Sequence, residues 1–166
     1  MSFLENPDFK DLPAALEKTG VQYLVVGGHA GGFHARPRAT KDLDLWIGEH
    51  PENRRRMGEA LQAFRAPQTI CHHLERAGPD DIVWFGRAPN RVDILQRLIS
   101  VEFDQALSRA VRARADELSV LVISMEDLIA NKRAAGRDQD LRDVRAPERC
   151  PSCARTASIE WPEVTA

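Results

Sequence analysis

The chain has 166 residues, of which 43% are apolar and 29% are charged, the composition of a globular domain rather than of a disordered chain. A formal net charge of −2 gives no overall attraction to nucleic acid or to an anionic membrane. Because no apolar run approaches the roughly 18 to 20 residues that cross a bilayer, and three cysteines are too few for a disulfide scaffold, we expect a cytoplasmic protein without membrane contact.

The first half of the chain predicts helices and strands in alternation. Its periodicity favours helices over 12–18, 29–34 and 51–64, and strands over 21–26 and 41–48. The first strand leads directly into two glycines. The second strand alternates between carboxylate and apolar side chains, so that its two faces have opposite character.

The second half adds three strands and three helices. We expect the strands at 82–85, 91–95 and 119–123, and the helices at 103–111, 124–136 and 138–145. The first two of these strands form an antiparallel hairpin across a Gly-containing turn. Ser124 and Asp127 have the spacing of a capping box, and Gly136 ends that helix. The pattern predicts an α+β (α/β-like) domain over 1–146, with a mixed sheet flanked by helices, and an irregular tail over 147–166.

Gly27 and Gly28 directly follow a buried strand and precede a predicted helix. Glycine permits positive φ and close backbone approach, and the N–H groups at such a turn can face an anion. The N-terminal end of the helix would add to the attraction for phosphate. The alternative for the two glycines on their own is an ordinary tight turn.

Asp42 and Asp44 are two residues apart on a predicted strand, so both side chains project from one face. Their Cα atoms are then roughly 6 to 7 Å apart, a spacing at which two carboxylates can hold a pair of Mg²⁺ ions. Leu43, Leu45 and Ile47 point the other way, into the core. The alternative is a half-exposed strand whose polar face is acidic without any function.

Asp93 repeats the pattern, because it lies among apolar residues on another predicted strand. A buried carboxylate there needs a partner or a cation. A salt bridge to Arg91 or Arg97 is one solution. The other is that Asp93 joins Asp42 and Asp44 as a third oxygen ligand for hard cations.

Taken together, the motifs resemble a known superfamily. Two glycines, a spacer, two alternating aspartates and a later strand aspartate are similar to the nucleotidyltransferase (DNA polymerase β-like) superfamily. More narrowly, 25–47 and the later helical segment with Lys132 and Asp140 resemble minimal nucleotidyltransferases of the AbiEii/MNT toxin–antitoxin type. The resemblance covers about residues 20 to 146. Pro147 and the tail after it depart from the pattern.

The resemblance implies a fold, an activity and roles for particular residues. The fold is the nucleotidyltransferase fold. Asp42, Asp44 and Asp93 would be catalytic and would bind two Mg²⁺ ions, with Asp93 orienting or deprotonating an acceptor hydroxyl. Nucleotide-binding roles fall to Gly27, Gly28, Arg38, Thr40, Lys132 and Arg137. For Lys132 and Arg137 the alternative is a solvated helix end.

The reaction implied is transfer of a nucleoside monophosphate from a nucleoside triphosphate to a hydroxyl on tRNA, protein or a small molecule. A toxin of this type would have a separate antitoxin partner. The rival hypothesis is a catalytically silent nucleotidyltransferase-like module that binds a nucleotide or a protein.

A zinc site is a weaker alternative in the C-terminal tail. Cys150 and Cys153 make half of such a site, and Cys71, His72 and His73 are conceivable further ligands. Because a single C-x-x-C has no evident second pair, we expect no stoichiometric zinc. We likewise interpret the histidine that follows the two glycines as a local hydrogen-bonding residue rather than a catalytic base.

Overall fold

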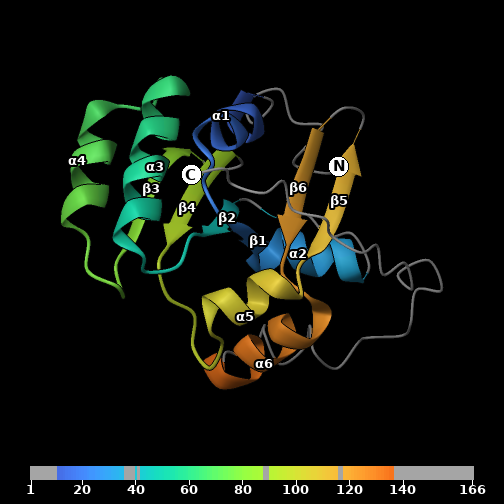
Figure 1. Cartoon of the computed structure of the whole chain (residues 1–166). Coiled ribbons are helices and arrows are strands. Elements are labelled where there is room, and N and C mark those ends of the chain that lie inside the picture. Colours follow the sequence, from blue (N-terminus) through green and yellow to red (C-terminus); the bar gives the residue numbers. More distant parts are fainter. Residues whose placement is uncertain (1–10, 36–39, 41, 88–89, 116–117, 137–166) are drawn as a thin grey trace.

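A computed structural model describes residues 11–35, 40, 42–87, 90–115 and 118–136. Within these residues, helices and a single sheet form layers (Figure 1). The helices are α1 (Asp11–Thr19), α2 (Gly27–His34), α3 (Pro51–Ala63), α4 (Gln68–Arg76), α5 (Phe103–Ser108) and α6 (Met125–Ala135). The strands are β1 (Leu24–Val26), β2 (Asp42–Trp46), β3 (Ile82–Arg87), β4 (Asn90–Leu95), β5 (Val111–Ala115) and β6 (Leu118–Val122).

The sheet has six strands in the order β3-β4-β2-β1-β6-β5 and is mixed, as the sequence predicted. Strands β3 and β4 form the expected antiparallel hairpin, and β5 and β6 form a second one. Strand β2 pairs parallel with β4 and antiparallel with β1. Strand β1 also pairs parallel with β6, through Val25 and Val122, and so joins the two hairpin-containing halves.

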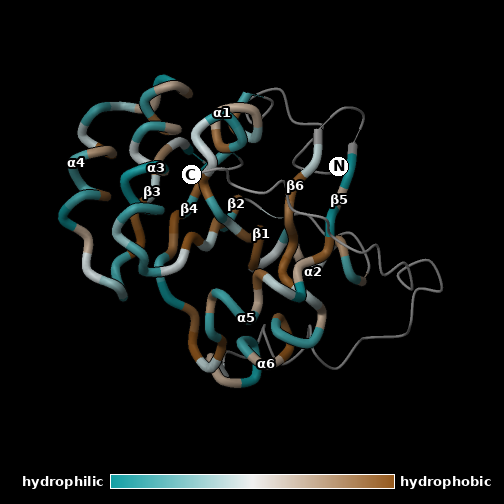
Figure 2. The backbone as a smooth tube through the Cα atoms, viewed as in Figure 1, coloured by the Kyte–Doolittle hydropathy of each residue, from teal (hydrophilic) through white to brown (hydrophobic). Residues whose placement is uncertain are grey.

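One face of the sheet is apolar and is covered by helices. Leu43 and Leu45 of β2 and Val92 and Ile94 of β4 are at most 1% exposed, so alternation puts every second residue of these strands into the core. Helix α4 packs against β3, α3 against α4, and α1 against α3. Figure 2 shows hydrophobic strands in the interior and hydrophilic stretches on the helices around them.

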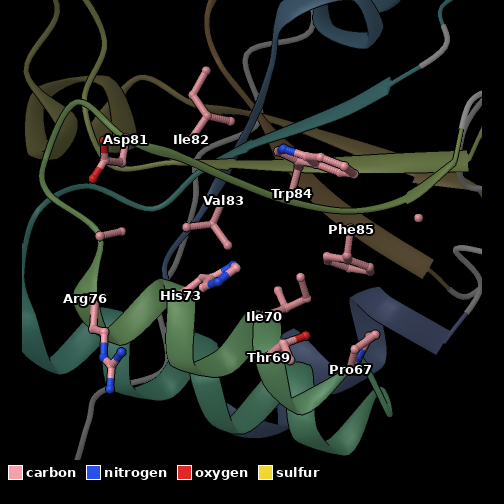
Figure 3. A pocket seen from close by; sticks show the side chains of 12 residues that line it. Pro67, Thr69, Ile70, His73, Arg76, Asp81, Ile82, Val83, Trp84 and Phe85 are labelled. Atoms are coloured by element: carbon pink, nitrogen blue, oxygen red, sulfur yellow. The ribbon is translucent and has the colours of Figure 1, made fainter.

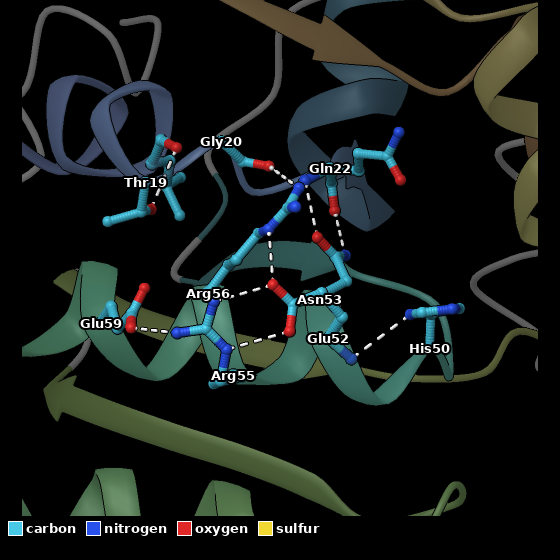
Figure 4. Close-up of polar contacts among 10 residues, drawn as sticks. Thr19, Gly20, Gln22, His50, Glu52, Asn53, Arg55, Arg56 and Glu59 are labelled. Atoms are coloured by element: carbon cyan, nitrogen blue, oxygen red, sulfur yellow. Dashed lines mark hydrogen bonds and ion pairs between the residues drawn. The ribbon is translucent and has the colours of Figure 1, made fainter. Parts of the chain in front are cut away.

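Helix α3 is fixed to the entry of β1 by one buried amide, Asn53 (Figure 4). Its Oδ1 accepts a hydrogen bond from the backbone N–H of Gln22 at 2.8 Å, and its Nδ2 donates to the carbonyls of Gln22 and Ile47, both at 2.7 Å. Arg55 and Arg56 on the same helix form surface ion pairs with Glu52. Both arginines are thus engaged within the protein.

The other face of the sheet is partly covered. Helix α2 contacts β1 and β2 on this side, and α6 packs against α2. At the far end of β2, Trp46 meets Phe103 of α5 edge to face, with ring centroids 5.0 Å apart. Over the outer strand β3 the face is open, because Ile82 and Trp84 are 54% and 56% exposed.

Some predicted elements differ from the structure. Helix α4 was not predicted, although Ile70, Cys71 and Leu74 have helical spacing; Pro67 at its N-cap makes no side-chain hydrogen bond, so no polar cap marks the start of the helix. The helix predicted over 103–111 ends at Ser108, because the residues from Val111 onward pair with β6. The first strand is shorter than predicted, and α2 begins at Gly27 itself.

The capping box of α6 is present in part. The hydroxyl of Ser124 accepts a hydrogen bond from the backbone N–H of Asp127 at 3.1 Å, and Gly136 ends the helix in the left-handed conformation. The helix predicted over 138–145 and the tail over 147–166 lie outside the described residues. Among the described helices, none is long and apolar enough to span a bilayer.

Candidate functional site

The pairing of β2 with β4 brings the three predicted acids to one face of the sheet. In this parallel register Asp42 lies opposite Arg91, and Asp44 lies opposite Asp93. Residues directly opposite each other on adjacent strands have side chains on the same face. The structure therefore assembles Asp42, Asp44 and Asp93 as expected, and it adds Arg91 to them.

Arg91 lies between two of the carboxylates. Its Nε donates to Oδ1 of Asp93 at 2.8 Å, and its Nη2 lies 2.7 Å from Oδ2 of the same carboxylate. The same Nη2 is 3.1 Å from Oδ2 of Asp42. A bidentate pair of this kind between arginine and a carboxylate is stronger than a single charge-assisted hydrogen bond. Of the two salt bridges that the sequence left open for Asp93, this one forms; Arg97 instead pairs with Glu49 and Asp80.

Among the described residues, Asp44 makes no salt bridge to an arginine, unlike Asp42 and Asp93. Burial and, after it, the negative charges of Asp93 and Asp42 raise the pKa of its carboxyl to about 6, although a hydrogen bond from the backbone of Gly28 and the charge of Arg91 act in the opposite direction. Removing a carboxylate from water disfavours its charged form, and like charges nearby do the same. Asp44 therefore lies in a pocket of negative potential that a cation would relieve.

Gly27 is required by the close approach of Asp44. Its φ is +62°, and a Cβ built on it would lie 2.1 Å from Oδ2 of Asp44. Only glycine fits both the left-handed backbone and this contact. The two glycines thus form the first turn of α2 and place its N-terminal backbone against the acid cluster, which is more than an ordinary tight turn requires.

The chemistry of these side chains fits a divalent cation, because in the described part of the chain three carboxylates gather around the Arg91 guanidinium and supply the oxygen ligands that Mg²⁺ prefers. Among the described residues, no group of three or more His, Cys, Asp or Glu side chains is arranged to hold a metal ion as they stand. Asp42 and Asp93 are instead set around Arg91. A cation shared by these acids requires the guanidinium to move away from them.

The other predicted nucleotide-binding residues lie around α2. Lys132 on α6 is 5% exposed, and its Nζ is 3.7 Å from where a Cβ would lie on Gly31, one turn after Gly27. The interpretation of Lys132 as a solvated helix end is therefore wrong. Thr40 precedes β2, and its hydroxyl donates to the carbonyl of Asp42 at 3.2 Å. Arg38 and Arg137 lie outside the described residues.

Two histidines of α2 lie in part-buried surroundings. Nε2 of His34 is 2.6 Å from the carbonyl oxygen of Ile123, so this ring links α2 to the end of β6. Burial lowers the pKa of both imidazoles, and for His29 the charge of Asp42 partly offsets that effect. Both rings are thus biased towards the neutral form.

The residues discussed for zinc do not meet within the described part of the chain. Cys71 is buried in α4, and Cys150 and Cys153 lie outside the described residues. The absence of zinc stays a prediction.

Sequence reasoning missed the contribution of the outer strand. Trp84 on β3 lies opposite Asp93, and the Arg91 guanidinium is 5.8 Å from the centroid of its ring. In Figure 3, Val83 and Phe85 point from β3 towards α4, where a cavity of about 630 Å³ lies, whereas Ile82 and Trp84 point to the other side. Alternation along 82–85 gives these facings, but only the strand register shows that Trp84 neighbours the acids.

No protein-family model matches the chain, and no curated protein sequence matches it.

Proposed function

We propose that the protein is a metal-dependent nucleotidyltransferase with the nucleotidyltransferase fold. One observation carries the proposal: the parallel register of β2 and β4 places Asp42, Asp44 and Asp93 on one face, directly against the glycine turn that opens α2. An acid cluster beside the N-terminal end of a helix combines groups suited to divalent cations with groups suited to phosphate. The resemblance of the sequence to minimal nucleotidyltransferases supports the same activity.

In the proposed reaction, an acceptor hydroxyl attacks the α-phosphorus of a nucleoside triphosphate. Asp93 orients the hydroxyl and takes its proton, the new O–P bond forms, the bond to the β-phosphate oxygen breaks, and pyrophosphate leaves. Asp42 and Asp44 would hold the cations, and Gly27 and Gly28 would let the backbone approach the phosphates. When bound, Mg²⁺ supplies positive charge that stabilises the attacking and leaving oxygens.

Several other groups have a place in this scheme. If the acids held cations, Arg91 would be able to pair with a phosphate, for which its planar guanidinium is well suited. Lys132, buried beside α2, adds positive charge one turn from the glycines. Arg38, Thr40 and Arg137 remain proposed nucleotide contacts. The proposed acceptors are tRNA, a protein or a small molecule, and a separate antitoxin protein is the proposed partner.

The test is incubation of the full chain with each α-labelled nucleoside triphosphate, Mg²⁺, and either total tRNA or cell lysate. We expect label to move onto one acceptor class, and EDTA to abolish the transfer. Replacing Asp44 with Asn keeps the shape of the side chain and removes one charge from the metal site. Loss of a preorganised electrostatic group costs on the order of 10²-fold or more in rate.

The matched control is Asp80→Asn, which makes the same chemical change at a carboxylate that is 79% exposed. It should transfer label at the wild-type rate. A folded Asp44→Asn variant with wild-type activity would contradict the proposal, and so would transfer that persists in EDTA.

A second function, a silent nucleotide-binding or protein-binding module, is favoured by one observation. Arg91 already neutralises part of the charge on Asp42 and Asp93, so the cluster can persist without a cation. This alternative predicts no transfer with any nucleotide, together with nucleotide binding that neither Mg²⁺ nor Asp44→Asn changes.

A further inference from the structure

The face of the sheet that carries Asp42, Asp44 and Asp93 also carries an exposed aromatic ring at its outer strand. Trp84 is 56% exposed on the outer strand β3, although a large aromatic side chain gains more from burial. Its Cα is paired with that of Asp93 on β4, which in turn is paired with Asp44 on β2. The ring is therefore one strand away from the acid that is proposed to act on the acceptor, at a spacing of about 4.8 Å per strand.

The side chains form an ordered row from the edge of the sheet inward. The Trp84 ring comes first, the Arg91 guanidinium lies 5.8 Å from its centroid, and the carboxylates of Asp93 and Asp42 contact that guanidinium. These groups match the three parts of a nucleotide. An aromatic plane can stack on its base, a cation can bind its phosphate, and a carboxylate can accept a hydrogen bond from its hydroxyl. A serine or threonine side chain offers its hydroxyl but neither a base nor a phosphate.

We infer that Trp84 is an acceptor-binding residue, on whose ring the terminal base of a single-stranded nucleic acid stacks, so that the sugar hydroxyl lies at Asp93. This inference rests on the proposed function for the role of Asp93, and it narrows the acceptor to a nucleic acid strand. Stacking on an aromatic side chain tolerates any base, since every base has a flat face. Trp84 is thereby a positioning platform that selects the class of acceptor and not its sequence.

The test measures binding separately from transfer. A short single-stranded RNA with a free 3′-hydroxyl and a 5′ fluorophore is titrated with the full chain, and its anisotropy is followed. We expect Trp84→Ala to weaken binding by between about 5-fold and 100-fold, the range for loss of one stacked base. Trp84→Phe should restore most of the affinity, because it restores an aromatic plane.

Ile82→Ala is the matched control, because Ile82 lies on the same strand and face and is 54% exposed. Its affinity for the RNA should equal that of the wild type. Affinity unchanged in Trp84→Ala, no binding by the wild type, or equal losses in Ile82→Ala and Trp84→Ala would each overturn the inference. Equal losses would point to an apolar surface for a protein partner.

The transfer assay separates this inference from the proposed function. In Trp84→Ala, KM for the RNA acceptor should rise while KM for the nucleoside triphosphate stays the same. Asp44→Asn should lose transfer and keep its affinity for RNA. If RNA binding depends on Trp84 but the protein transfers no nucleotide, the stacking role of Trp84 is supported and the proposed enzymatic function is refuted. If the protein transfers nucleotide and Trp84→Ala changes neither RNA binding nor transfer, the enzymatic function is supported and the stacking role is refuted.

Discussion

The two faces of the sheet are built from alternate residues of the same strands, and they differ in what holds them together. On one face, Leu43 and Val92 are buried under helices. On the other, Asp93 is buried and Asp44 is half-buried although both are charged, and among the described residues Arg91 balances part of their charge. The first face gains free energy from the removal of apolar surface from water, whereas the second loses free energy by desolvating charge.

Residues that are adjacent in sequence can therefore contribute to the free energy of folding with opposite sign. A strand such as β2 is stable because its apolar side compensates for its acidic side. Substitutions at neighbouring positions should therefore change the free energy of unfolding in opposite directions, and three of them test the comparison.

The largest effect is expected at Leu43, which is 1% exposed. Leu43→Asn removes a buried aliphatic group and leaves a polar one without water, so it should lower the free energy of unfolding by about 3–5 kcal/mol. Urea denaturation followed by circular dichroism measures the loss. Leu43→Met, which conserves volume, should cost less than about 1.5 kcal/mol. Similar stabilities for the Asn and Met variants would show that this face is not a packed core.

An intermediate effect is expected at Gly27, whose left-handed backbone lies directly against the Asp44 carboxylate. Gly27→Ala places a methyl group 2.1 Å from Oδ2 of Asp44 at a φ of +62°. We expect a loss of about 2–3 kcal/mol, part from the left-handed backbone and part from displacement of the carboxylate.

Gly58→Ala is the matched control for this change. Gly58 lies within α3, and a Cβ there would meet no atom within 4 Å. Alanine should stabilise the helix by about 0.5–1 kcal/mol. If both alanine variants gained stability in thermal denaturation, the close approach of Asp44 to the glycine turn would be disproved.

The smallest effect has the opposite sign. Because the pKa of Asp44 is raised from its ordinary value to about 6 in the folded protein, its carboxyl favours folding when protonated, and this contribution is lost as the pH rises through about 6. Asp44→Asn removes the titration. Without added metal, the variant should be more stable than the wild type by about 1–3 kcal/mol at pH 8.

Near pH 4 the difference should shrink to less than about 1 kcal/mol, because the carboxyl is then protonated in the folded state and about half charged in the unfolded one. Chemical denaturation at both pH values measures the difference. If Asp44→Asn gained the same stability at pH 4 and pH 8, the pKa of the Asp44 carboxyl would not be raised in the folded protein.

The sequence predicted the strands of the central sheet well, because alternation is a local property. Carboxylates two residues apart had to share a face, and Leu43 between them had to face the core. Helix α4 and strand β5 were missed for different reasons: the first has no polar N-cap to mark its start, and the second exists through its pairing with β6. Tertiary pairing overrides weak local preference in such segments.

For the candidate site, the sequence supplied the residues but not their neighbours. The three aspartates and two glycines were identified from their spacing. That Arg91 bridges Asp42 and Asp93, and that Trp84 lies beside them, follows from the register of three strands. Register between strands distant along the chain is set by the whole packed sheet, which no local pattern encodes.

The bridge made by Arg91 has a consequence for the order in which the protein acquires its structure. It joins β2 to β4, and two helices and a strand lie between them along the chain. Contacts between such distant segments form slowly, because a long loop must close first, whereas the β3–β4 hairpin closes locally. During synthesis, Asp42 and Asp44 leave the ribosome well before their counter-charge. Until Arg91 has been synthesised, the chain therefore carries two like charges on one strand. Their repulsion disfavours formation of β2 until the β3–β4 hairpin has formed.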